Sequence, residues 1–230
     1  MNKKLFIIIP IVIILIGGLI FAGVKIFQNK NKFTGTNTTA QNGENKTNSE
    51  IKEDNIKEEE NSMYSKGIHH ATIEVKNYGT IKLELDADTA PITVANFAKL
   101  VNEGFYDGLT FHRIIDGFMI QGGDPLGNGT GGSSENIKGE FKLNGVKNNI
   151  AHVRGVISMA RATPYNSASS QFFIVHEDSR FLDGQYAGFG KVTEGIEIVD
   201  KICEDIPVVD NNGTVLKDNQ PIIEKITMND

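Results

Sequence analysis

The residues best suited to binding chemistry fall in one stretch, FHRIIDGFMIQGGD at 111–124. If a tight Asp-Gly turn joins two strands here, side-chain alternation brings Arg113 close to residues beyond the turn. Those neighbours are Phe118, Met119 and Gln121. One fixed guanidinium beside an aromatic ring and a thioether would make a binding pocket with a single charge. The same residues also fit a surface arginine on a half-buried sheet, and residue types alone leave both interpretations open.

Other motifs in the chain do not indicate a cofactor or a metal. The loop GNGTGG at 127–132 matches G-x-G-x-x-G, but no apolar helix follows it and no phosphate-loop Lys-Ser/Thr is present, so it predicts a turn-rich surface loop. The five histidines lack metal-binding spacing, and no G-x-S-x-G motif occurs. Cys203, the single cysteine, can form neither an intramolecular disulfide nor a cysteine-based zinc site. We therefore predict no metal and no cofactor.

The elements that must position Arg113 and its neighbours are mostly short strands. Alternating apolar and polar residues at 70–76 and 80–85, separated by Asn-Tyr-Gly, predict a hairpin. Further strands are predicted at 109–115, 117–121, 155–160, 171–175, 186–192 and 221–228.

Two helices are predicted to cover these strands. One begins near Pro91, with Thr89 or Asp88 as its cap, and ends at Gly104, and the other spans 194–202. Many short strands with two helices indicate a mainly β fold, a closed barrel with helical covers.

The amino terminus, residues 1–27, is predicted to lie outside this domain as a membrane anchor. Residues 5–24 carry no charge, and a helix of that length spans roughly 30 Å, the hydrocarbon thickness of a bilayer. A cleaved signal peptide is the alternative, although the stretch is long for such a segment and no A-x-A motif follows it. Lysines flank both ends, which leaves the orientation open by charge. We expect a single-pass protein of the cell membrane with its folded part outside the cytoplasm.

Residues 28–66 are predicted to form a flexible polar linker, because their scattered apolar residues cannot bury a core. A helix over 50–60, supported by i,i+4 charge pairs, is the alternative for part of it. The folded domain is predicted at 67–230. It carries 14 Lys and Arg against 22 Asp and Glu, and the whole chain has a net charge of −6. This balance argues against a nucleic-acid partner.

Five blocks of sequence then occur in the order typical of one family. They are FHRIIDGFMIQGGD (111–124), GTGG (129–132), GVISMARA (155–162), SQFFIV (170–175) and LDGQYAGFGKV (182–192). They resemble the cyclophilin-type peptidyl-prolyl cis-trans isomerases, and the resemblance runs from about Ile73 to Ile226. It implies a closed eight-stranded antiparallel barrel capped by two helices, with a proline pocket on its outer face. Together with the apolar amino terminus, it suggests a bacterial membrane-anchored form.

The resemblance also implies the site residues by position. Arg113 resembles the catalytic arginine, and His112 sits beside it as in family members. The implied pocket lining is Phe118, Met119, Phe173 and Leu182. The implied contacts to the peptide backbone are Gln121, Gln171, Ala160 and Arg161.

Three positions depart from the eukaryotic pattern. Phe181 stands where many eukaryotic members have a tryptophan that contacts cyclosporin, and Tyr186 stands where they have a histidine lining the pocket. Both forms resemble bacterial members, so we expect substrate contacts at these positions but only weak cyclosporin binding. Arg161 replaces a common asparagine and can alter the preference for residues before proline.

The implied function is isomerisation of X-Pro bonds in proline-containing peptides and unfolded protein segments, assisting exported or surface proteins. Rotation about such a bond has a barrier of about 18–20 kcal/mol because the twisted amide loses resonance, and no bond breaks. An apolar pocket that holds the ring and an arginine that donates to the proline nitrogen suit this reaction. A non-catalytic proline-peptide-binding module or holdase on the same fold is the alternative.

Overall fold

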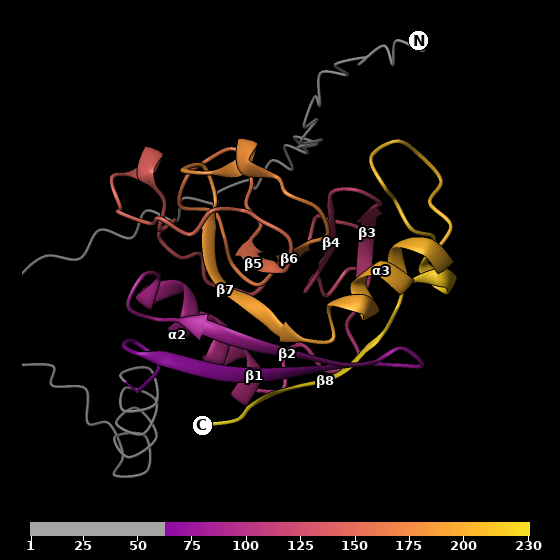
Figure 1. Ribbon diagram of the computed structural model, residues 1–230, viewed down its shortest axis with the longest axis horizontal. Helices are drawn as coiled ribbons and strands as arrows, with labels where there is room; N and C mark the ends of the chain where they lie inside the picture. Colours follow the sequence, from indigo (N-terminus) through magenta and orange to yellow (C-terminus); the bar gives the residue numbers. More distant parts are fainter. Residues whose placement is uncertain (1–62) are drawn as a thin grey trace, which may run out of the picture. The chain divides into compact units, whose positions relative to one another are not determined.

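The computed structural model describes residues 63–230, whose framework is one eight-stranded antiparallel sheet (Figure 1). The strands are β1 (Ile68–Val75), β2 (Gly79–Asp86), β3 (Phe111–Ile115), β4 (Met119–Gly122), β5 (Val156–Met159), β6 (Phe172–Val175), β7 (Ala187–Glu194) and β8 (Ile223–Met228). Their order across the sheet is β3-β4-β6-β5-β7-β2-β1-β8. The mainly β prediction is confirmed, and a strand is present at each predicted position.

The predicted hairpin is formed by β1 and β2, which pair along their full length from Ile68 opposite Asp86 to Val75 opposite Gly79. Asn77 in the turn has φ 66°, a left-handed conformation that asparagine tolerates better than most residues. Alternate side chains of β1 face the core, as the sequence pattern predicted.

The two edges of the sheet, β3 and β8, are joined beside their ends by an isolated bridge between Thr110 and Ile222, where Ile223 also hydrogen-bonds to Gly108 and Leu109. Phe111 donates its N–H to the carbonyl of Pro221 at 2.9 Å, but proline has no N–H to donate in return. Beyond this point β3 hydrogen-bonds to the irregular segment 213–215 instead of β8. The prediction of a closed barrel is therefore wrong, and the sheet is a curled half-barrel.

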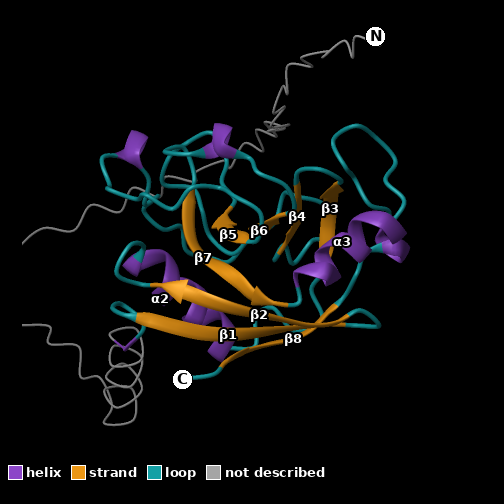
Figure 2. Cartoon of the chain, in the orientation of Figure 1, coloured by secondary structure: helices purple, strands orange, loops and turns teal. Residues whose placement is uncertain are grey.

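Helix α2 (Pro91–Asn102) packs against β8, β2 and β7, and helix α3 (Ile196–Asp205) packs against β2. Both helices were predicted, and α3 begins after Gly195 and extends past residue 202. Short 3-10 helices interrupt the loops: η1 (Lys142–Asn144), η2 (Arg180–Leu182) and η3 (Lys217–Asn219). Figure 2 shows η1 and η2 among long loops on the opposite side of the domain from β1 and β8.

The predicted capping of α2 by Thr89 or Asp88 is wrong. The buried carboxylate of Glu140, from the loop after β4, accepts the N–H groups of Ile92 at 3.1 Å and Thr93 at 2.8 Å. A distant residue therefore satisfies the free donors at the start of the helix and places a carboxylate at its positive end.

The predicted anchor at 5–24, and the predicted linker up to residue 62, lie outside the described residues. Tyr64, at the end of the predicted linker, is 4% exposed and joins the main core. Its ring packs edge-on against His69, with 4.9 Å between centroids. The packed part of the chain thus includes a residue before the predicted boundary at 67. Within 63–230, no helix is long and apolar enough to cross a membrane.

Candidate active site

A second hydrophobic cluster lies apart from the main core and draws on β4, β5, β6 and η2. We call it the pocket cluster; its buried members are Met119, Val156, Phe173, Val175 and Leu182. Partly buried residues that pack against it include Phe118, Ala160 and Tyr186. All four residues predicted to line the pocket thus meet in one cluster, although they are spread over 65 positions of the sequence.

Aromatic side chains extend the pocket cluster to the surface. The Phe181 ring is 50% exposed and lies 5.4 Å from the Phe118 ring, and the Tyr186 ring meets Phe173 edge-on at 6.0 Å. Exposed aromatic faces beside a buried apolar cluster can bind a small apolar ring such as a pyrrolidine.

The guanidinium of Arg113 is held beside this cluster from two sides. Its Nε donates to the backbone carbonyl of Asn212 at 2.8 Å, and its Nη1 donates to Oε1 of Gln121 at 3.1 Å. Nη1 also lies 3.9 Å from the Met119 sulfur, and the Phe118 ring centroid is 5.9 Å from the guanidinium carbon. Nη2 donates to none of the described residues, so its two N–H groups remain for a ligand.

The surroundings of Arg113 lower its pKa, but the guanidinium stays charged. Burial lowers the pKa of the guanidinium, whereas Tyr186 and Asp210 raise it. An arginine pKa starts so far above neutrality that the side chain stays charged.

Gln121 and Gln171 continue the hydrogen bonding away from the arginine. Gln121 Nε2 donates to Oε1 of Gln171 at 2.8 Å, and Gln171 Nε2 donates to the carbonyls of Gly129 at 3.2 Å and Gly131 at 2.7 Å. This series of hydrogen bonds fixes the orientation of both side-chain amides, so that Oε1 of Gln121 faces Arg113.

The glycine-rich loop at 127–132 is shaped by one buried carboxylate. Asp124 accepts the backbone N–H groups of Leu126, Asn128 and Gly129 at 2.8, 3.0 and 2.6 Å. Burial alone would raise the pKa of Asp124, but the backbone donors outweigh it and hold the pKa below its usual value. The loop therefore supports Gln171 through the carbonyls of Gly129 and Gly131.

The predicted peptide-binding edge follows β5. Ala160 donates its N–H to the carbonyl of Gln171 at 2.9 Å, whereas the backbone of Arg161 makes no hydrogen bond to the described residues. The guanidinium of Arg161 packs on Tyr186, with 4.7 Å from its carbon to the ring centroid. Arg161 thus combines an open backbone edge with a charge next to the pocket cluster.

His112, next to Arg113 on β3, is a predicted site residue that does not belong to the pocket cluster. It is 4% exposed, and neither ring nitrogen has a hydrogen-bond partner among the described residues. Burial lowers its pKa to about 4, with Asp124 opposing and Arg113 reinforcing the shift. His112 is therefore a buried, neutral imidazole at physiological pH.

Sequence reasoning missed Asn212, whose backbone carbonyl holds Arg113. Its loop is folded by Asp210, which accepts the N–H groups of Asn212 and Thr214, each at 3.0 Å. A backbone carbonyl leaves no trace in residue type, and 99 positions separate Asn212 from Arg113. The Asp-Asn-Asn-Gly sequence at 210–213 signals a turn but not what the turn contacts.

His152 was also missed. Its buried ring stacks on Phe173, with 6.1 Å between centroids and 19° between planes. The ring nitrogens contact Asp183 and Ser158, each at 3.0 Å. Burial lowers the pKa of His152 while Asp183 opposes the shift. His152 thereby supports a pocket residue from behind, a role that an isolated histidine in a sequence does not reveal.

One group of side chains outside this site could hold a metal ion. Ligand atoms of Asp116, His176 and Cys203 lie within 4.8 Å of one another. However, Nδ1 of His176 accepts the N–H of Gly117 at 3.0 Å, its Nε2 lies 3.0 Å from Asp200, and burial raises the pKa of the Cys203 thiol to about 12. His176 thus links the β3–β4 turn to α3 through Gly117 and Asp200.

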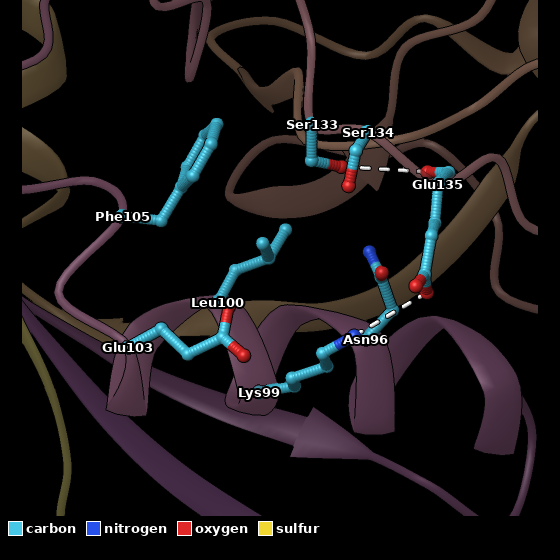
Figure 3. A pocket seen from close by; sticks show the side chains of 8 residues that line it. All are labelled: Asn96, Lys99, Leu100, Glu103, Phe105, Ser133, Ser134 and Glu135. Atoms are coloured by element: carbon cyan, nitrogen blue, oxygen red, sulfur yellow. Dashed lines mark hydrogen bonds and ion pairs between the residues drawn. The ribbon is translucent and has the colours of Figure 1, made fainter. Parts of the chain in front are cut away.

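A surface pocket lies between α2 and the segment 133–135, with Leu100 at its base (Figure 3). Lys99 and Glu135 form an ion pair across it at 3.3 Å. Its lining is Asn96, Lys99, Leu100, Glu103, Phe105, Ser133, Ser134 and Glu135. None of the predicted site residues borders it, so this pocket is separate from the candidate active site.

Comparison with known proteins agrees with this geometry. Residues 70–228 match the family model described as cyclophilin type peptidyl-prolyl cis-trans isomerase/CLD. Peptidyl-prolyl cis-trans isomerase B of Bacillus subtilis is 49% identical over 138 residues, which are 60% of this chain and 87% of the relative. A peptidyl-prolyl cis-trans isomerase of Helicobacter pylori is 47% identical over 154 residues, 66% of this chain and 88% of the relative.

A solved structure shows the same fold. The crystal structure of a Cryptosporidium parvum cyclophilin type peptidyl-prolyl cis-trans isomerase, in the presence of the dipeptide Ala-Pro, aligns with a TM-score of 0.61 and 34% identity. The alignment covers 70% of this chain and 99% of that one. The family match, the relatives and the fold together establish that this chain belongs to the cyclophilin-type peptidyl-prolyl cis-trans isomerases and is an enzyme of that activity.

Proposed function

We propose that this isomerase acts from a single membrane anchor on X-Pro bonds in unfolded segments of exported or surface proteins, with Arg113 as its catalytic residue. The observation that carries the assignment of Arg113 is its guanidinium, fixed by Asn212 and Gln121 next to the pocket cluster with Nη2 unused. The Ala-Pro dipeptide in the related crystal structure supports a proline-containing peptide as the ligand.

The pocket cluster acts on the ground state of the amide. A pyrrolidine ring placed against Phe118, Met119 and Phe173 leaves water, and so does part of the neighbouring carbonyl. The planar amide is stabilised by resonance that puts negative charge on its oxygen. Removing water from that oxygen disfavours the planar form, and the rotated form loses less because its charge separation is smaller.

Arg113 acts on the twisted amide. As the bond rotates, the lone pair of the proline nitrogen becomes free to accept a hydrogen bond. The unused N–H groups of Nη2 can donate to that lone pair while Asn212 and Gln121 keep the guanidinium in place. A donor held in advance needs no reorganisation when the transition state forms, which favours that state over the planar one.

The energies indicate that neither the pocket cluster nor Arg113 accounts for the acceleration alone. An acceleration of about five decades requires roughly 7 kcal/mol of differential stabilisation. One charge-assisted hydrogen bond contributes about 1.5–3 kcal/mol. The remainder must come from desolvation and orientation of the proline in the pocket cluster.

An exchange assay tests the catalytic assignment. The full-length chain, purified in detergent, would be added to a short X-Pro peptide, and cis–trans exchange rates measured by NMR. Arg113→Ala should lower the catalysed rate about 100-fold because the donor to the twisted nitrogen is lost, whereas Arg180→Ala should not. Peptide binding without any exchange by the unaltered chain would favour a holdase, and wild-type exchange by Arg113→Ala would remove Arg113 from the mechanism.

The proposed location rests on the uncharged stretch at 5–24, which is long enough to span a bilayer as a helix. Protease added to intact, wall-stripped cells should release the isomerase domain by cutting between residues 28 and 62. Protection of the domain until the cells are lysed would place it in the cytoplasm instead.

A further inference from the structure

The side chain of Arg161 is fixed within a cage of three aromatic rings. Its guanidinium carbon lies 5.1 Å from the Phe141 centroid, 5.2 Å from Tyr165 and 4.7 Å from Tyr186. Contacts of this kind hold a cation over the negative faces of the rings. Because Tyr186 also packs on Phe173 of the pocket cluster, the cage holds this charge at the border of the proline pocket.

Backbone carbonyls hold the same side chain. Arg161 Nε donates to Gln185 at 3.0 Å, and Nη1 donates to Ala162 at 3.0 Å and Thr163 at 3.2 Å. Nη2 donates to none of the described residues. Its two N–H groups therefore remain available to a ligand. Because the side chain has already lost most of its rotational freedom, binding does not have to offset that loss of entropy.

Arg161 and Arg113 share a feature that the other two arginines lack. Arg154 lies 2.7 Å from Asp200, and Arg180 lies 3.9 Å from Asp178. Among residues 63–230, neither Arg113 nor Arg161 has a carboxylate within ion-pair distance. Both unpaired guanidinium groups are at the site, in a domain whose formal charge after residue 66 is 14 − 22 = −8. Such a local reversal of charge marks the place where a negatively charged ligand is favoured.

The backbone at Arg161 offers a place for an extended peptide. Ala160 already donates its N–H to Gln171, whereas the N–H and carbonyl of Arg161 make no hydrogen bond to the described residues. A peptide that pairs with this open edge would carry its side chains past the guanidinium at about 3.3 Å per residue.

We propose that Arg161 makes the site select proline segments with an aspartate or glutamate within about three residues of the proline. This inference rests on the proposed function, because it assumes that the peptide occupies the pocket cluster and the edge at Arg161. The competing explanation for the position of Arg161 is a purely structural role, in which its guanidinium only packs against the three aromatic rings.

Three peptides that differ at one position test the proposal. Each has the same sequence around one proline, with glutamate, glutamine or lysine two residues before it. NMR exchange with the full-length chain in detergent gives kcat/KM for each. We expect the glutamate peptide to exceed the glutamine peptide by about three- to tenfold, as for a partly exposed charge pair, and the lysine peptide to be slowest. The ratio of kcat/KM for the glutamate peptide to that for the glutamine peptide should fall towards one near 1 M salt, because salt screens exposed charges.

Variants then locate the source of the preference. Arg161→Gln should bring the glutamate-to-glutamine ratio close to one, and Arg161→Lys should retain part of it because the charge stays but the fork is lost. Lys82→Gln removes the same charge from β2, where the lysine pairs with Glu194 at 2.7 Å, and should leave the ratio unchanged. Ratios are compared because Arg161 borders the site and absolute rates can change in its variants.

The outcomes separate this inference from the proposed function. Absence of turnover for all three peptides would refute the proposed function itself. Turnover with equal kcat/KM for glutamate and glutamine would overturn only the role of Arg161, as would a preference that persists in Arg161→Gln. Should Arg161→Gln fail to fold, Arg161→Lys, which should retain only part of the preference, still locates it, and a preference unaffected by salt would overturn the proposal because it is not electrostatic.

Discussion

Arg113 uses different nitrogens for support and for the proposed chemistry. Nε and Nη1 are occupied by Asn212 and Gln121, and Nη2 is left for the substrate. Arg113→Lys keeps the charge but has one nitrogen in place of three, so it cannot bond to both supports and also donate to the substrate. We expect kcat/KM in the NMR exchange assay to fall about 10- to 100-fold, the equivalent of one charge-assisted hydrogen bond. A rate within threefold of wild type would show that charge alone suffices.

His112 makes stability depend on pH. Its folded-state pKa is about 4 against an ordinary value of 6.5, so the unfolded chain takes up the proton first as the pH falls. Stability should therefore decline from about pH 6.5 down to about pH 4, with roughly 2 kcal/mol lost at pH 5 from this residue. Urea unfolding followed by circular dichroism, which suits a chain without tryptophan, measures the decline.

The matched variant is His112→Phe, which needs no hydrogen-bond partners where the histidine has none. The loss of stability between pH 7.5 and pH 5 should shrink by about 2 kcal/mol in this variant. Leu143→Ala, at an exposed position that carries no titratable group, is the control and should keep the wild-type slope. An unchanged slope in His112→Phe would assign the acid sensitivity to other groups.

At the scale of elements, α2 depends on a residue far from it in the sequence. Glu140 accepts two backbone N–H groups of its first turn and the Thr93 hydroxyl, at 2.7 to 3.1 Å. Glu140→Gln replaces one accepting oxygen with an NH2 group that faces these donors, and should lower the free energy of unfolding by about 1–3 kcal/mol. Glu135→Gln, an exposed change at the Lys99 ion pair, should cost less than about 1 kcal/mol in the same urea titration. Equal effects would contradict the capping role.

Local patterns predicted the elements well and their assembly less well. Alternation in β1 and β2 and the helical spacing of α2 are set by neighbouring residues, so the sequence shows them directly. The half-barrel was missed because Pro221 and the segment 213–215 limit pairing between chain regions about 110 residues apart. The capping of α2 by Glu140 was missed for the same reason, since donor and acceptor are 47 positions apart in the sequence.

The site residues also separate into those that local sequence patterns predict and those that depend on the whole fold. Arg113, Phe118, Met119 and Gln121 belong to one hairpin, so strand alternation alone brought them together in the prediction. Phe173, Leu182 and Tyr186 could be added only through the family resemblance, because their positions depend on the whole sheet. Support through a backbone carbonyl, as at Asn212, is invisible to both kinds of reasoning.

At the scale of the whole molecule, the main core and the pocket cluster are separate groups of apolar side chains. Substitutions in the pocket cluster can therefore change peptide binding while the main core still holds the sheet together. The amino-terminal boundary of this packed region includes Tyr64, whose side chain belongs to the main core.

That boundary gives a prediction about where the chain can be shortened. Tyr64 is 4% exposed, belongs to the main core and packs on His69, so a fragment beginning at residue 63 keeps this ring and one beginning at 67 loses it. Both fragments should isomerise a short X-Pro peptide, because every proposed site residue lies beyond 110. The fragment 67–230 should be less stable than 63–230 by about 3–5 kcal/mol, the usual effect of removing a buried aromatic side chain. Urea unfolding compares them, with Met63→Ala in the longer fragment as an exposed control. Equal stabilities would place the boundary at 67 as the composition indicated, and a folded but inactive 63–230 would mean that catalysis requires the amino-terminal segment.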